Sequence, residues 1–218
     1  MECSLRFFRI AVRFLSVARM DLYEVAEALE SLGYAIVAPL PPKRFRVSIG
    51  GSGPIASKGS VVVDVNSDTM VVGVSAPSPE ECVREFIAVE RAIRSRIEAL
   101  RETHFYELLA EIEARIGTDP TELMERALRG SPIVEELSRA LGEPLTVFGI
   151  RLARAGASPE DSEWIDIEVV PSLARPRTSL SVAIVYRSRD RERVLDVGRS
   201  VLRLVEDALQ RLAASGRR

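Results

Sequence analysis

The segment 49–60, IGGSGPIASKGS, offers the first possible chemistry in the sequence. From Gly51 to Ala56 it fits the spacing G-x-G-x-x-A, which in dinucleotide-binding proteins leads into a helix whose N-terminal N–H groups hold a pyrophosphate. Here Pro54 and a β-branched run from Val61 follow the glycines, so a strand is expected instead of a helix. We therefore predict a mobile loop over 52–59, with anion binding by its backbone N–H groups and Lys58 as the open alternative.

The other residues that could do chemistry are one histidine, His104, and two cysteines, Cys3 and Cys82. They are too few for any usual zinc site or disulfide framework, and they fit a reducing, cytoplasmic compartment. No motif places a nucleophile or a base beside His104 or Cys82. We predict a surface or capping histidine, a packed thiol, no catalytic residue, no metal and no cofactor.

The composition describes a chain that can bury a core without a strong charge bias. Of the 218 residues 46% are hydrophobic, and the net charge is −2, so nucleic-acid or membrane binding is not implied globally. Only Lys43 and Lys58 are lysines, and Asn66 and Gln210 are the only amides, which indicates a heat-adapted protein or a GC-rich genome. Arginines interrupt the apolar N-terminus, so neither a signal segment nor a membrane span is expected there.

The elements that must position these residues follow from periodicity. Alternation over 4–16 predicts a strand with one buried side, and a helical stripe over 21–33 follows it. Strands are predicted at 44–49, 60–65 and 69–75, with a short extra strand at 34–37 and a helix at 78–100. Helices are predicted throughout 104–141. Strands resume at 145–153, 163–170 and 179–187, and a long amphipathic helix closes the chain.

These elements divide the chain into a β-α-β-β-β-α unit over 1–103, a helical connector over 104–141 and a β-β-β-α unit over 142–218. The halves echo each other: VAEALESLGYAIVAP and VEELSRALGEPLTVF both read as a helix and then a strand. We interpret this as a degenerate internal duplication, with a chance match of two ordinary units as the alternative. The predicted fold class is α+β, an antiparallel sheet covered on one side by long helices.

Arginines on the predicted strands are the candidate binding residues. If Phe8, Ile10 and Val12 form the core, the opposite side of the sheet carries Arg9, Arg13, Arg44 and Arg46, which could track phosphates. A second basic run lies around the last hairpin and the start of the last helix: Arg175, Arg177, Arg187, Arg189, Arg191 and Arg193. The alternative is an ordinary arginine-rich surface with carboxylates nearby.

The first half also resembles a known family. ARMDLYEVAEALESLGY is similar to the first strand–helix passage of the TATA-box-binding protein family, and SVVVDVNSDTMVVGVSAPSPEECVREF to its last hairpin and second helix. The resemblance covers residues 5–100; the second half matches in outline and is expected to lack the first strand. It implies a curved, saddle-like sheet. It does not carry over promoter binding, because paired phenylalanines are missing and Asn66 lies in a turn.

These observations predict a non-enzymatic binding module whose exposed sheet face contacts a macromolecule. A protein partner is favoured over nucleic acid, since the net charge is negative and few aromatic residues lie on the predicted face. No membrane contact is predicted, and a homodimer is compatible with the pattern. The alternative is a carrier or an enzyme that holds a small apolar ligand between sheet and helix.

Overall fold

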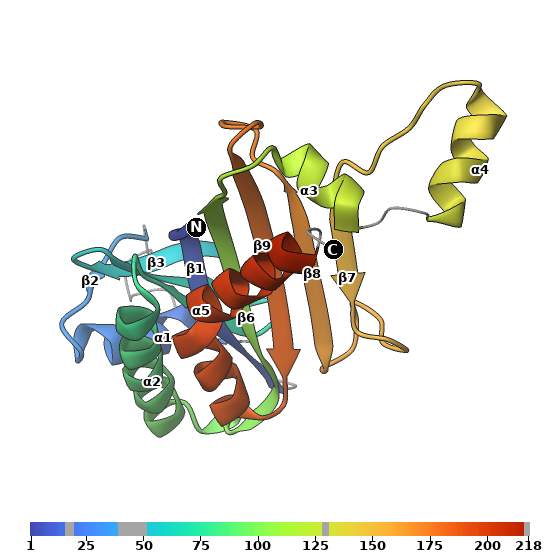
Figure 1. Cartoon of the computed structure of the whole chain (residues 1–218). Helices are drawn as coiled ribbons and strands as arrows, with labels where there is room; N and C mark the ends of the chain where they lie inside the picture. Colours follow the sequence, from blue (N-terminus) through green and yellow to red (C-terminus); the bar gives the residue numbers. More distant parts are fainter. Residues whose placement is uncertain (16–19, 39–51, 128–130, 216–218) are drawn as a thin grey trace.

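The computed structural model describes residues 1–15, 20–38, 52–127 and 131–215 (Figure 1). Its nine strands form one antiparallel sheet in the order β2-β3-β4-β5-β1-β6-β9-β8-β7. The strands are β1 (Glu2–Leu15), β2 (Ala35–Ile36), β3 (Ser52–Lys58), β4 (Val61–Asn66), β5 (Val71–Ser75), β6 (Glu102–Arg115), β7 (Ile150–Ala153), β8 (Trp164–Pro171) and β9 (Ser179–Ser188). The helices are α1 (Leu22–Glu30), α2 (Pro79–Arg96), α3 (Pro120–Ala127), α4 (Pro132–Leu141) and α5 (Arg191–Ser215), with a short 3-10 turn at Glu98–Leu100.

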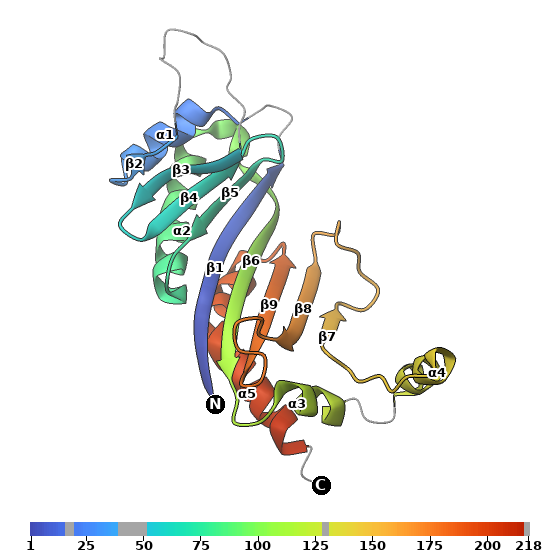
Figure 2. The ribbon, with the colours of Figure 1, turned by 90° about the horizontal axis from the view of Figure 1, so that it is seen from above.

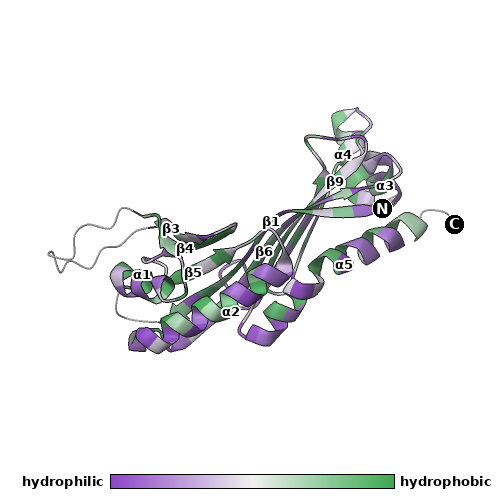
Figure 3. Ribbon diagram, turned by 90° about the vertical axis from the view of Figure 1, so that its left-hand side faces the viewer, coloured by the Kyte–Doolittle hydropathy of each residue, from purple (hydrophilic) through white to green (hydrophobic). Residues whose placement is uncertain are grey.

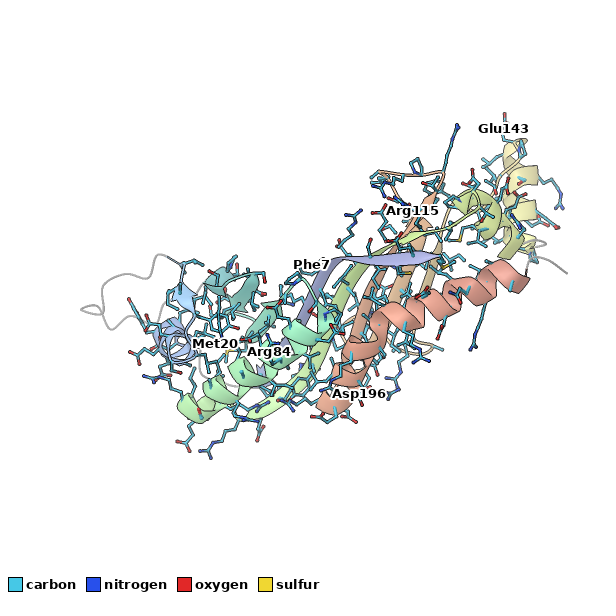
Figure 4. The ribbon with its side chains drawn as sticks, turned by 60° about the vertical axis from the view of Figure 1, so that its left-hand side comes forward. Phe7, Met20, Arg84, Arg115, Glu143 and Asp196 are labelled. Carbon is cyan, nitrogen blue, oxygen red and sulfur yellow. The ribbon has the colours of Figure 1, made fainter. Side chains whose placement is uncertain are left out.

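The predicted fold class is confirmed. Helices α1, α2 and α5 lie on the same side of the sheet (Figure 3). The alternation in β1 explains why: Phe8, Ile10, Val12 and Phe14 are buried beneath these helices, whereas Phe7 lies on the other side of the sheet, as Figure 4 shows. Ser78 caps α2 as predicted, because its hydroxyl accepts a hydrogen bond from the Glu81 N–H.

The two halves of the chain share one order of elements. Each half begins with a long strand, β1 or β6, continues through helices and shorter strands, and ends with a long helix, α2 or α5. The two long strands pair with each other along almost their whole length in the middle of the sheet (Figure 2). From the centre outward, β1 is followed by β5, β4, β3 and β2, and β6 is followed by β9, β8 and β7. Each half therefore has the same strand order, and the second half has one strand fewer.

The prediction of helices throughout 104–141 is wrong for its first part, which is β6. The second half therefore does have a first strand of its own. Tyr106, Leu108, Ala110, Ile112 and Ala114 are buried on the helix side, so the segment has period two. Its composition of Glu, Leu and Ala favours a helix locally, but pairing with β1 on one side and β9 on the other outweighs that preference.

The glycine segment is a strand rather than a loop. No helix begins behind Gly53, as predicted, but Ser52–Lys58 pairs with β4 as β3. Among the described residues, β2 pairs with β3 at Ser57 and Ala56 and no strand pairs with β3 beside Pro54 on that side, which is the edge position where a proline is tolerated. Lys58 points to the helix side, where its amino group contacts Glu85 of α2 at 3.3 Å. The predicted strand at 44–49 lies outside the described residues.

Candidate interaction surfaces

A row of charged side chains crosses the open side of the sheet, the side opposite α1, α2 and α5. Cross-strand pairing aligns Asp64 of β4, Gly73 of β5, Ala11 of β1, Glu107 of β6 and Arg187 of β9. Arg9, two residues before Ala11 on the same side, reaches over to Asp64. We call Asp64, Arg9, Glu107 and Arg187 the charged row. Its signs alternate along the four side chains.

Arg9 and Asp64 form a two-pronged ion pair. Arg9 Nε donates to Asp64 Oδ1 at 2.8 Å, and Nη2 donates to Oδ2 at 2.6 Å. Burial would lower the pKa of Arg9, but the hydrogen bonds and charge of Asp64 outweigh it, and the pKa is raised. The guanidinium passes directly over Gly73, where a Cβ would collide with it. A glycine is thus required where the arginine crosses β5.

The other end of the row is built around an aromatic ring. Arg187 donates through Nε (3.0 Å) and Nη2 (2.5 Å) to Glu107 Oε2, and it lies 4.2 Å above the ring of Phe105. Arg13 approaches the same ring at 5.7 Å. Arg187 also donates to the backbone carbonyls of Pro159 and Asp161. These contacts hold both the cation and the loop before β8 in place.

The predicted arginines do not form one basic patch. The structure brings Arg9, Arg13 and Arg187 together, but two of them are neutralised by carboxylates. Arg189 is nearby and donates to Ser162 Oγ at 2.7 Å. Arg175 and Arg177 are exposed on the β8–β9 turn, at the opposite end of the strands, with Arg175 at 3.8 Å from Glu113. Arg44 and Arg46 lie outside the described residues.

Sequence reasoning missed Glu107 and Phe105, because it assigned their segment to a helix. The alternation of 105–114 was the signal that could have placed both side chains on the open side.

Neither residue considered for acid–base or thiol chemistry has a catalytic arrangement among the described residues. Cys82 is buried, its Sγ donates to the Val74 carbonyl at 3.1 Å, and burial raises its pKa to about 12. His104 is on β6, not at a helix start; burial and then the charges of Arg13, Arg189 and Arg187 lower its pKa. The thiol is packed and protonated, which disfavours nucleophilic chemistry at Cys82.

A second surface is an apolar groove on the helix side of the second half, with a volume of about 490 Å³. It lies between α5 and the strands β7, β8 and β9. The side chains that define it include Leu152, Ile165, Ile167, Val201, Leu204 and Leu212. Tyr186 contributes the only polar side chain among the described residues that line it. The groove can accept an apolar surface but has almost no group to orient a polar ligand.

We expect Gly73→Ala to displace Arg9 from Asp64 and to lower the free energy of unfolding by about 1–2 kcal/mol, since a charge-assisted hydrogen-bonded pair is lost. Chemical denaturation measures this, with Gly117→Ala as control, because a Cβ at Gly117 meets no atom within 4 Å. In the Gly73→Ala background, Arg9→Ala should cost less than in the wild type. Equal costs in both backgrounds would contradict the assigned contact.

The described residues contain no cluster of three or more metal-binding side chains, and none of their helices is long and apolar enough to cross a membrane. No protein-family model matches the chain, and the search of curated proteins finds no match.

Proposed function

We propose that the chain is a non-enzymatic binding module whose open sheet side contacts a protein partner. We also propose that its fold is of the kind found in the TATA-box-binding protein family. The strand order, which extends outward on both sides of the central β1–β6 pair, and the placement of α1, α2 and α5 on one side of the sheet support this assignment. In such an arrangement the side without helices is the natural contact surface.

The charged row is the observation that carries the choice of a protein partner. Nucleic-acid backbones present one sign of charge, and affinity for them comes from cations that replace condensed counterions. Here Arg9 and Arg187 are each held by a carboxylate at 2.6 Å and 2.5 Å, so phosphates would have to displace Asp64 and Glu107. A row of alternating sign is complementary to another protein surface of alternating sign.

Fluorescence anisotropy with labelled DNA and RNA at two salt concentrations tests whether the partner is a nucleic acid. We expect weak binding with a shallow dependence on salt. The opposite outcome is micromolar or tighter binding that falls steeply with salt and is lost when Arg9 and Arg13 are substituted by alanine. That outcome would identify the partner as a nucleic acid instead of a protein.

The protein partner itself is tested in two steps. A photoreactive phenylalanine analogue at Phe7, which lies on the open side, captures the partner for purification. The affinity of the purified partner is then measured for the wild-type chain and for the double variant Arg9→Asp with Asp64→Arg. This variant exchanges the two charges and keeps them opposite in sign. We expect a loss of roughly tenfold or more. The control is Asp196→Arg with Arg199→Asp on α5, on the helix side. Equal losses in both double variants would reject the open side as the contact.

The alternative of a small apolar ligand has one observation in its favour. The groove of about 490 Å³ falls within the usual range for ligand pockets, roughly 300–1,000 Å³. Its lining would not fix the orientation of a ligand, however, and we assign the groove to a different occupant below.

A further inference from the structure

The apolar groove lies where the first half of the chain has a helix. In the first half, α1 packs beside α2 and against β2 and β3, and it buries Leu22, Val25, Ala26, Ala28 and Leu29. In the second half, α5 takes the place of α2, and β7 and β8 take the places of β3 and β4. The position corresponding to α1 is the groove beside α5, over β7 and β8.

Two helices, α3 and α4, precede β7 in the second half, and α3 contacts α5 and β8 without contributing a residue to the lining of the groove. The helix whose sequence corresponds to α1 is α4, and it does not occupy the groove. The sequence echo aligns α4 with α1, and a glycine with positive φ follows each helix, Gly33 at 81° and Gly142 at 69°. Yet α4 stands away from the sheet, beyond β7 (Figures 1 and 2), and none of its side chains is buried. Glu143, two residues beyond the end of α4, lies at the upper end of the molecule in Figure 4.

One face of α4 is apolar, as in helices that pack against other elements. Ile133, Leu137 and Leu141, spaced four residues apart, lie on one face and are 66%, 48% and 64% exposed. The segment after α4 adds two more exposed apolar side chains, Leu145 and Phe148. The described chain thus contains an apolar groove without a helix and an apolar helix without a groove.

We propose that α4 of a second copy occupies the groove, so that two copies exchange their α4 helices around a twofold axis. Each copy would contribute the ten residues of α4 and the fifteen that line its groove. Together these match the roughly 20–30 residues that each side of a standard interface supplies. The exchange closes on itself, because each copy offers one helix and one groove.

The lengths of the connections favour a second copy over the chain's own α4. Residues 142–149 connect α4 to β7, which lies at the outer edge of the sheet. On the other side, α3 is anchored by the buried side chains of Leu123 and Met124, and only 128–131 separate it from α4. Short connections of this kind promote exchange between copies.

Sedimentation equilibrium of the whole chain tests the association. We expect a dimer, and we expect Leu137→Asp to weaken it by roughly 30-fold or more, because a charge enters the centre of an apolar contact. Leu173→Asp is the matched control: Leu173 is 97% exposed on the β8–β9 turn, and the dimer should persist. A wild-type chain that stays monomeric at its solubility limit would overturn the proposal, as would equal weakening by both substitutions.

Cysteine crosslinking shows which copy supplies the helix. In a Cys3→Ser background, one chain carries Leu137→Cys and another carries Leu204→Cys, a groove residue that is half exposed. Mixing the two chains under mild oxidation should join them by a disulfide, whereas Leu173→Cys in place of Leu137→Cys should not. A chain with both cysteines that forms only an internal disulfide, with no crosslink in the mixture, would overturn the exchange and assign the groove to the chain's own α4.

Discussion

Glu90→Ala is expected to lower the free energy of unfolding by about 3 kcal/mol, one of the largest effects of any single substitution in this chain. Glu90 is buried and accepts hydrogen bonds from Arg94 Nε (3.0 Å), Tyr106 Oη (2.8 Å) and Arg191 Nε (2.7 Å). One carboxylate therefore connects α2, β6 and α5. Its removal leaves two part-buried guanidinium groups and a buried hydroxyl with fewer partners, which costs more than a surface ion pair.

Chemical denaturation of the purified chain measures this effect. Glu98→Ala is the control: Glu98 also pairs with an arginine, Arg101 at 3.0 Å, but its side chain is 81% exposed. The loss there should stay below about 1 kcal/mol. Similar losses for the two variants would show that the buried carboxylate does not join the halves of the molecule.

Phe8→Ala is expected to cost about 3–5 kcal/mol, since the whole ring is removed from a packed interior. Phe8 is 1% exposed, and its ring lies under α5 near Gly198, where the helix approaches β1 and β6. Its neighbour Phe7 is 38% exposed on the open side, so Phe7→Ala removes the same group at a smaller cost. The difference between their denaturation midpoints measures the burial. Equal midpoints would contradict the register of β1.

Much of this fold could be predicted from local patterns. The alternation in β1 and the Ser78 cap of α2 each depend on residues within a few positions, and both were predicted correctly. The short strand β2 was also expected at 34–37. Where the local signal and the tertiary environment agree, the sequence alone suffices.

The errors have the opposite cause. The segment 104–115 is rich in helix-forming residues, and only its position between two long strands makes it β6. The pairing of Arg9 with Asp64 depends on three strands lying in one register, with Gly73 between the two charges, and no spacing within the sequence reveals this. The groove beside α5 is likewise open because α4 lies away from it, and only the assembled sheet shows this.

The central pairing of β1 with β6 means that the two halves cannot be separated into independent modules. Each of these strands has fourteen residues, and each supplies the inner edge of its own half. A half released from the other would present this long edge, with its backbone N–H and C=O groups free to pair with any other strand. The simplest such partner is an identical half, joined edge to edge. A single chain satisfies these edges within one molecule, so the fusion of the two halves protects against aggregation.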